Sequence, residues 1–328
     1  MRIFLFLLLG FPLLLSAQVQ TADSLVSAGI RLYRQGLPQQ ATAKYEAALR
    51  LDKRNGRALY ELAYAAFERG AFREAIRYTT RMRRYRTAAL VRAYQLEGSA
   101  YDELDLDKKA IKRFRQGLQR YPDNYLLHYN LALTYFQNER FPEAITQLEA
   151  ALVANPTHAS SHYMLGYIWT AYENKLPAAL ALQFFLLLEP DSPRSKQALD
   201  LLEDCLQQIA TKRRPQVPAQ PANVIAAADR TAALTFAQLP LDERPVDLAG
   251  RLRVLDTVCA AQFGPAVATQ NAFFWTFYAD FIVNVVNAGH LEALSYFITQ
   301  QRGGASFFWL EGHQPEVRAL FDWLASIE

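Results

Sequence analysis

Five alanines recur at a nearly constant interval through the first 180 residues of the chain. Their successive spacings are 34, 35, 34 and 34 residues, and each alanine lies between a turn-like break and an apolar helical run. A fixed period of this length is typical of arrays in which each repeat is one small unit stacked on the next. The spacing therefore predicts a stacked helical scaffold, whose alanines are Ala41, Ala75, Ala110, Ala144 and Ala178.

A second small residue recurs about a dozen positions before each alanine. In four repeats we expect a core leucine one residue before it. Small side chains at both positions let two helices approach closely, while apolar residues at three- and four-residue steps form one face. The pattern predicts that helix A crosses helix B in every repeat. The small residues are Gly29, Ala63, Gly98, Ala132 and Gly166, and the leucines are Leu62, Leu96, Leu131 and Leu165.

Turn-forming residues fall where this arrangement needs them. Gly36 and Gly70 separate helix A from helix B, and Pro38 and Pro142 stand in the first turn of helix B, where a missing N–H is harmless. These residues resemble the tetratricopeptide repeat family, whose 34-residue helix-turn-helix units carry this pattern. The resemblance implies an all-α fold with a TPR-type α-solenoid, and the 35-residue step implies one residue inserted before Val91. The five units are residues 22–55, 56–89, 91–124, 125–158 and 159–192.

The chain begins with one basic residue, Arg2, and an apolar run that ends at Ser16 and Ala17. This pattern predicts a secretory signal peptide over residues 1–17, with an uncleaved membrane anchor as the alternative. No later apolar run has spanning length. We therefore expect an exported protein, periplasmic or secreted, without stable membrane insertion once the signal is removed.

Three further segments follow from composition. The repeat array, residues 18–209, ends in a predicted cap helix at 194–209, because a repeat array needs a solvated end. A Pro-rich linker is predicted at 210–223 and a small helical domain of no recognised family at 224–328. Cys205 and Cys259 both fall on apolar helix sides, so that a disulfide and two buried thiols remain alternatives.

Without the signal peptide the chain has 34 basic and 32 acidic residues. This near-neutrality gives no general reason to bind nucleic acid or an anionic membrane. The sharpest local feature is an arginine ridge in helix B of the second unit, formed by Arg73, Arg77, Arg81 and Arg84. A solvated helix face is the favoured interpretation, with contact to acidic protein, lipid headgroups or cell-wall polymer as the alternative.

The family resemblance also implies a concave groove lined by helix A, which would hold a protein or peptide ligand. Aromatic side chains are frequent there, and they are common anchors in peptide recognition. The alternative is that these rings pack between A helices or under another segment of the chain. The predicted binding residues are Tyr60, Tyr64, Phe67, Arg92, Gln95, Tyr129, Leu133, Phe136, Tyr163 and Tyr167.

Catalytic and metal-binding patterns are nearly absent. His158 and His162 have the spacing of a metal pair, but no nearby cysteine or carboxylate completes a set. The chain also lacks a Ser-centred elbow, a phosphate-binding glycine loop and a CxxC motif. We therefore expect a non-enzymatic interaction scaffold without catalytic residues, cofactor or metal. The alternatives are an active site in the C-terminal domain near Asp280 and Glu311, and an architectural subunit of an envelope complex.

Overall fold

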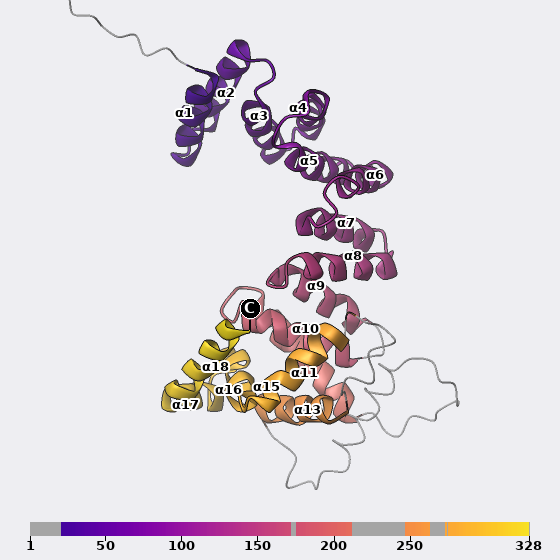
Figure 1. The fold of residues 1–328 in the computed structure, drawn as a ribbon, viewed down its shortest axis with the longest axis vertical. Coiled ribbons are helices and arrows are strands. Elements are labelled where there is room, and N and C mark those ends of the chain that lie inside the picture. Colours follow the sequence, from indigo (N-terminus) through magenta and orange to yellow (C-terminus); the bar gives the residue numbers. More distant parts are fainter. Residues whose placement is uncertain (1–20, 172–174, 212–246, 263–272, 274, 328) are drawn as a thin grey trace, which may run out of the picture. The chain divides into compact units, whose positions relative to one another are not determined.

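The computed structural model describes residues 21–171, 175–211, 247–262, 273 and 275–327, and all regular elements within these ranges are helical. The predicted all-α repeat fold is therefore confirmed. Ten helices form five consecutive A–B pairs (Figure 1). They are α1 (Ala22–Arg34), α2 (Pro38–Leu51), α3 (Gly56–Glu68), α4 (Phe72–Tyr85), α5 (Leu90–Asp102), α6 (Asp107–Leu118), α7 (Tyr125–Gln137), α8 (Phe141–Ala154), α9 (Ala159–Thr170) and α10 (Lys175–Leu188).

The chain divides into two compact units between Gly117 and Leu118, at the end of α6. The first unit contains α1 to α6, and the second begins with α7. The predicted signal peptide and most of the predicted linker lie outside the described residues. After α10 the second unit contains α11 (Ser195–Thr211), α13 (Leu248–Gln262), the π-helix η2 (Trp275–Ala279), α15 (Asp280–Asn287), α16 (Leu291–Ile298), the 3-10 helix η3 (Gln300–Arg302), α17 (Ala305–Gly312) and α18 (Gln314–Ser326).

The five alanines that define the period are all completely buried. The small residues of helix A leave room for a larger residue four positions after each alanine. A Cβ added at Gly29 would lie 2.4 Å from the Tyr45 ring, and one at Gly98 would lie 2.3 Å from the Phe114 ring. The A–B crossing is therefore confirmed, with glycine opposite the aromatic residue of helix B.

One leucine of the predicted core is misplaced. Leu62, Leu131 and Leu165 directly precede the small residue and are buried, but Leu96 lies two residues before Gly98 and is only half-buried. The equivalent position belongs to Glu97, which is completely buried. Arg83 donates to both oxygens of this carboxylate at 2.6 and 3.1 Å, and Arg113 approaches Oε1 at 3.0 Å. A buried ion-pair cluster thus replaces the leucine and ties α4, α5 and α6 together.

The turn between helix A and helix B has the same left-handed residue in four repeats. Gly36, Gly70, Asp105 and Glu139 have φ values of 76°, 76°, 55° and 58°. Their spacings are 34, 35 and 34 residues, so that the extra residue lies between Gly70 and Asp105. Arg86, with φ of 50°, ends α4 at this point.

The C-terminal helices pack on the last repeat and on α11 within the second unit. Phe184 of α10 contacts the rings of Phe277, Tyr278 and Phe281 at centroid distances of 5.2, 5.5 and 4.5 Å. Arg302 of η3 donates a hydrogen bond to Asp200 of α11 at 2.8 Å. The predicted cap helix therefore forms and is itself covered in part by the following domain.

Cys205 and Cys259 are both buried thiols and are not joined to each other in the structure. The buried-thiol alternative therefore holds. Of the helices that the structure describes, none combines the length and the apolar character that a membrane crossing requires.

Candidate partner-binding surfaces

Three of the predicted residues, Tyr60, Tyr64 and Arg92, join Tyr33 in a row across three successive A helices. Tyr33 of α1 meets Tyr64 of α3 edge-on at 6.4 Å, and Tyr64 stacks with Tyr60 at 6.2 Å. The guanidinium of Arg92, on α5, lies over the Tyr60 ring at 5.1 Å from its centroid. Burial raises the pKa of Tyr60 above its usual value, opposed by the nearby Arg92, so that its hydroxyl remains a hydrogen-bond donor at neutral pH.

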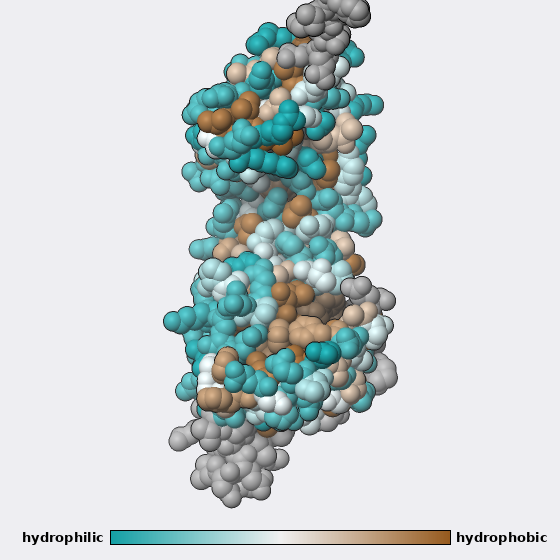
Figure 2. Space-filling view, turned by 90° about the vertical axis from the view of Figure 1, so that its left-hand side faces the viewer, coloured by the Kyte–Doolittle hydropathy of each residue, from teal (hydrophilic) through white to brown (hydrophobic). Residues whose placement is uncertain are grey.

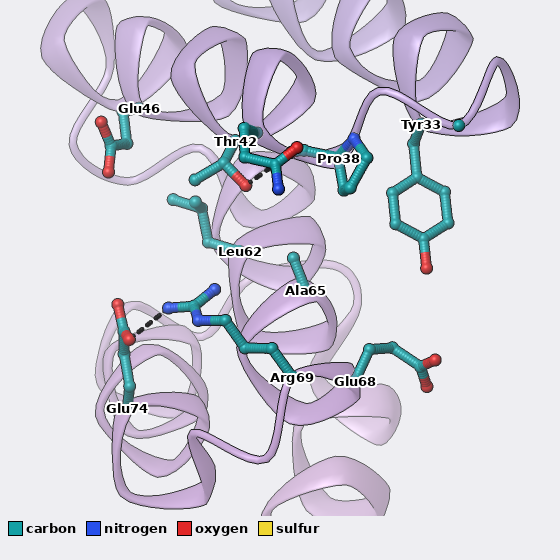
Figure 3. A pocket seen from close by; sticks show the side chains of 11 residues that line it. Tyr33, Pro38, Thr42, Glu46, Leu62, Ala65, Glu68, Arg69 and Glu74 are labelled. Carbon is teal, nitrogen blue, oxygen red and sulfur yellow. Dashed lines mark hydrogen bonds and ion pairs between the residues drawn. The ribbon is translucent and has the colours of Figure 1, made fainter.

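A cavity of about 750 Å³ opens beside this row, between the first two repeats. Figure 3 shows Pro38, Thr42 and Glu46 on one side and Leu62, Ala65 and Glu68 on the other, with the Tyr33 ring at one end. Arg69 and Glu74 form an ion pair at its rim. Its size falls within the range of small-ligand and side-chain pockets.

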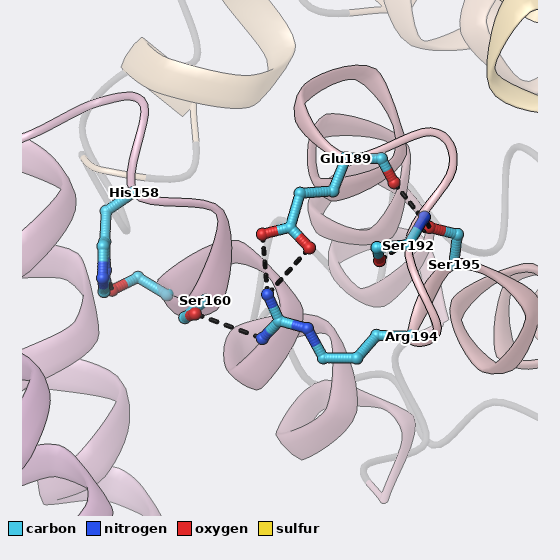
Figure 4. A network of polar contacts seen from close by, with 7 residues as sticks. His158, Ser160, Glu189, Ser192, Arg194 and Ser195 are labelled. Atoms are coloured by element: carbon cyan, nitrogen blue, oxygen red, sulfur yellow. Dashed lines mark hydrogen bonds and ion pairs between the residues drawn. The ribbon is translucent and has the colours of Figure 1, made fainter. Parts of the chain in front are cut away.

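The second unit has its own cluster, organised around Arg194 just before α11. This guanidinium donates to both oxygens of Glu189, at 2.7 and 2.8 Å, and to Ser160 Oγ at 3.1 Å (Figure 4). It also lies 5.5 Å from the centroid of the Tyr163 ring. Residues at the ends of α9, α10 and α11 are thereby fixed together.

Tyr129 of α7 completes this cluster. Its ring contacts that of His158 at 4.8 Å, and its hydroxyl forms a hydrogen bond with Ser160. Burial, and then the charge of Arg194, lower the pKa of His158, so that its ring is neutral at pH 7. The result is a preorganised cluster with aromatic faces and one ion pair, Arg194 with Glu189.

The remaining predicted binding residues lie in several environments. Phe67 contacts Phe72 at 5.2 Å, and Phe136 contacts Phe141 at 5.7 Å, so each packs within its own A–B hairpin. Tyr167 meets Phe136 at 5.9 Å and keeps 41% of its surface exposed. Leu133 and Gln95 are half-buried. Of this group, Tyr167 is the residue most open to a partner.

Sequence reasoning missed Tyr33, His158 and Arg194. Tyr33 occupies the same repeat position as Phe67 and Phe136, and this register was available in the sequence. Arg194 had no such signal, because it lies between the fifth repeat and the cap helix. On the surface view of Figure 2, apolar side chains gather in separate patches within a largely hydrophilic face, in keeping with local binding surfaces.

The histidine pair is used for packing. His162 is buried, and its two ring nitrogens are 2.7 Å from the Tyr278 hydroxyl and 2.8 Å from the Pro156 carbonyl oxygen. His158 Nδ1 lies 2.8 Å from Ser161 Oγ. Among the described residues, no three His, Cys, Asp or Glu side chains are grouped as metal ligands.

The chain is similar to several solved structures at low sequence identity. MamA from Desulfovibrio magneticus RS-1 is 20% identical, with 52% of this chain and 97% of that chain covered and a TM-score of 0.45. YrrB, described as a TPR protein with an unusual peptide-binding site, is 19% identical, with coverages of 56% and 92% and a TM-score of 0.43. PilW, a type IV pilus biogenesis factor, is 16% identical, with coverages of 58% and 93% and a TM-score of 0.48.

None of the curated proteins compared with this chain matches it in sequence. A family model described as tetratricopeptide repeat matches residues 26–89, 108–159 and 129–194. These segments contain all five buried alanines, whereas α5 lies between the matched segments. The repeat region of this chain therefore belongs to the tetratricopeptide repeat family.

Proposed function

We propose that this protein is a non-enzymatic interaction scaffold that binds an extended peptide or a partner subunit through its helix A surfaces, in an extracytoplasmic compartment. The observation that carries the proposal is the row Tyr33–Tyr64–Tyr60–Arg92 of the first unit. Packed helix axes lie about 8–10 Å apart, and an extended chain advances about 3.3 Å per residue. Each helix therefore serves roughly three ligand residues.

The row suits a peptide for chemical reasons. Tyrosine rings provide contact area with few rotatable bonds, and their hydroxyls bond with a ligand backbone. Arg92 is exposed and is oriented by its contact with Tyr60. It would bind a carboxylate or a carbonyl group of the ligand. The Tyr129–Arg194 cluster offers similar chemistry in the second unit.

Selection of peptides from a random library tests this proposal. Peptides selected on the wild-type protein are titrated against the double variant Tyr60→Ala/Tyr64→Ala and against Arg92→Ala. We expect at least a tenfold loss of affinity for both. Tyr78→Ala, on helix B, is the matched control and should bind normally.

Unchanged affinity of both variants would refute the proposed surface. Arg92→Ala keeps the test valid if the tyrosine variant loses stability, because Arg92 is exposed. Thermal unfolding of each variant reports that stability directly.

Export is tested separately, by the intact mass of the protein isolated from cells. Removal of residues 1–17 supports the extracytoplasmic assignment, whereas retention of the full N-terminus in the cytoplasmic fraction contradicts it.

No observation favours the enzyme alternative over the scaffold. Asp280 and Glu311 are exposed, and Asp280 accepts from Asn284 at 3.3 Å. Neither carboxylate lines the cavity beside the tyrosine row.

A further inference from the structure

The near-neutral charge of the chain conceals a strong asymmetry between its two units. Residues 21–117 contain 20 Lys and Arg against 11 Asp and Glu, whereas residues 118–328 contain 14 against 21. The division at Gly117 was not visible in the repeat pattern, which continues through it. The first unit therefore carries a net positive charge of nine, which the balance of the whole chain hides.

Many of these cations lie on the outer stripes of two helices B. Helices α4 and α6 bury equivalent residues 35 positions apart, Ala75 with Ala110 and Thr79 with Phe114. The opposite stripe is exposed on both helices. We call it the basic face, and it consists of Arg73, Arg77 and Arg84 on α4 and Lys108, Lys112 and Arg115 on α6.

The buried Glu97 cluster links these two helices through α5. Arg83 of α4 and Arg113 of α6 both bind this one carboxylate of α5. At the positions equivalent to Arg73 and Arg77, α2 has Gln39 and Ala43, and at those equivalent to Lys108 and Lys112, α8 has Pro142 and Thr146. Arg50 of α2 is the counterpart of Arg84. The stripe of three cations is therefore found on α4 and α6, whereas α2 retains one of them.

Few carboxylates lie on the two helices that carry the basic face. Glu74, the acidic residue of α4, pairs with both Arg69 and Arg77, and Asp107 is the acidic residue of α6. The six cations of the face outnumber these two carboxylates, and Arg77 also lies 5.9 Å from the Tyr78 ring centroid. The outward field of the face is therefore positive.

We propose that the basic face binds an anionic lipid surface. A headgroup layer presents anions at every spacing and therefore requires no matching cavity. All six residues of the face are cations, so binding through them is electrostatic and uses neither a stacked base nor an apolar anchor. Binding of this kind is electrostatic, reversible and weakened by salt.

Vesicle sedimentation of the full chain tests the proposal, with phosphatidylcholine alone and with phosphatidylcholine containing one-quarter phosphatidylglycerol. The measured quantity is the ratio of the two partition coefficients, because any apolar insertion contributes to both. The test variant is Arg73→Gln/Arg77→Gln/Lys108→Gln/Lys112→Gln. The control, Arg31→Gln/Arg34→Gln/Lys44→Gln/Arg50→Gln, removes the same charge from α1 and α2.

We expect the wild-type ratio to be high in 50 mM salt and near one in 500 mM salt. The basic-face variant should lower it by roughly tenfold or more, and the control should change it far less. Equal loss in both variants would show that only net charge matters and would overturn the assignment. Failure of the wild type to prefer anionic vesicles, with binding to polyglutamate instead, would also overturn it.

Discussion

At the scale of single residues, Asp256 of α13 has the most unusual environment. It is completely buried, and Gln183 Nε2 of α10 donates to its Oδ1 at 3.1 Å. The other carboxylate oxygen and Gln183 Oε1 are both buried acceptors without a partner. A proton on Asp256 supplies the donor that these two acceptors lack, and burial raises the pKa of Asp256 to about 7.

Between about pH 4 and pH 7, the native state therefore keeps this proton while the unfolded chain releases it. The contribution of Asp256 to stability is fully present below about pH 4 and falls as pH rises to about 7, by up to about 1.4 kcal/mol per pH unit. Asp256→Asn supplies a permanent donor and should remove this decline. His162, whose pKa burial lowers to about 4, titrates in the opposite sense. The measurement is therefore the difference in urea unfolding free energy between wild type and Asp256→Asn from pH 4 to 8. A difference that does not vary with pH would contradict the prediction.

Glu97 gives a second residue-scale prediction. Removing a buried carboxylate leaves two arginines facing one another, which typically costs about 3–5 kcal/mol. We expect Glu97→Ala to lose this amount in urea unfolding, while Glu103→Ala, at an exposed position nearby, should be close to neutral. Arg83→Met/Glu97→Leu/Arg113→Met should recover most of the loss, because it restores the leucine of the other repeats. Equal effects of the two glutamate substitutions would contradict the burial of this charge cluster.

At the scale of elements, the A–B hairpin was predictable from sequence because its requirements are local. The alanine and its small partner are dictated by one helix crossing, and their period is independent of the ligand. Glu97 and Leu96 were confused because both lie beside the crossing and only the leucine fits a hydrophobic core. Arg194 was missed because its partners, Ser160 and Glu189, come from two different helices. Side-chain networks across elements leave no period in the sequence.

Each A–B turn of the first four repeats contains one residue with a left-handed backbone. The sequence predicted this turn residue only in the two repeats where it is glycine. Glu139 holds φ of 58°, a region that costs a non-glycine residue about 1–2 kcal/mol. Part of this is offset by the greater freedom of glycine in the unfolded chain. Glu139→Gly should therefore stabilise the protein by about 0.5–1 kcal/mol in urea unfolding. Gly70→Ala, at the equivalent turn, should destabilise it, and a loss of stability in Glu139→Gly would contradict the argument.

The helix crossing makes a further prediction. A methyl group at Gly98 has no room beside the Phe114 ring, so Gly98→Ala should cost about 1–3 kcal/mol through overpacking. Gly312→Ala is a matched control, because a Cβ there meets no atom within 4 Å. A double-mutant cycle with Phe114→Leu measures whether the two positions are coupled. Additive effects would indicate that the crossing lies elsewhere.

At the scale of the molecule, the contacts of the C-terminal domain indicate that it covers the end of the repeat array. It covers α10, the most apolar helix of the array, where Leu180, Phe184 and Leu187 meet η2, α15 and α16. The cavity left between them has only about 10 Å³. A terminal repeat needs such a cover because its outer face has no following repeat.

Truncation separates a cover from an independent module. A chain ending at residue 211 retains α11 but exposes Phe184 and its neighbours on α10. We expect it to bind a hydrophobic dye strongly and to elute as oligomers in size-exclusion chromatography. A chain ending at residue 303 keeps α13, η2, α15 and α16 over α10, and it should elute in the same oligomeric state as the full protein, with low dye binding. If the shorter chain is as soluble and as stable as the full protein, the C-terminal helices are not a structural part of the repeat array. Their contact with α10 would then be available for exchange with a partner.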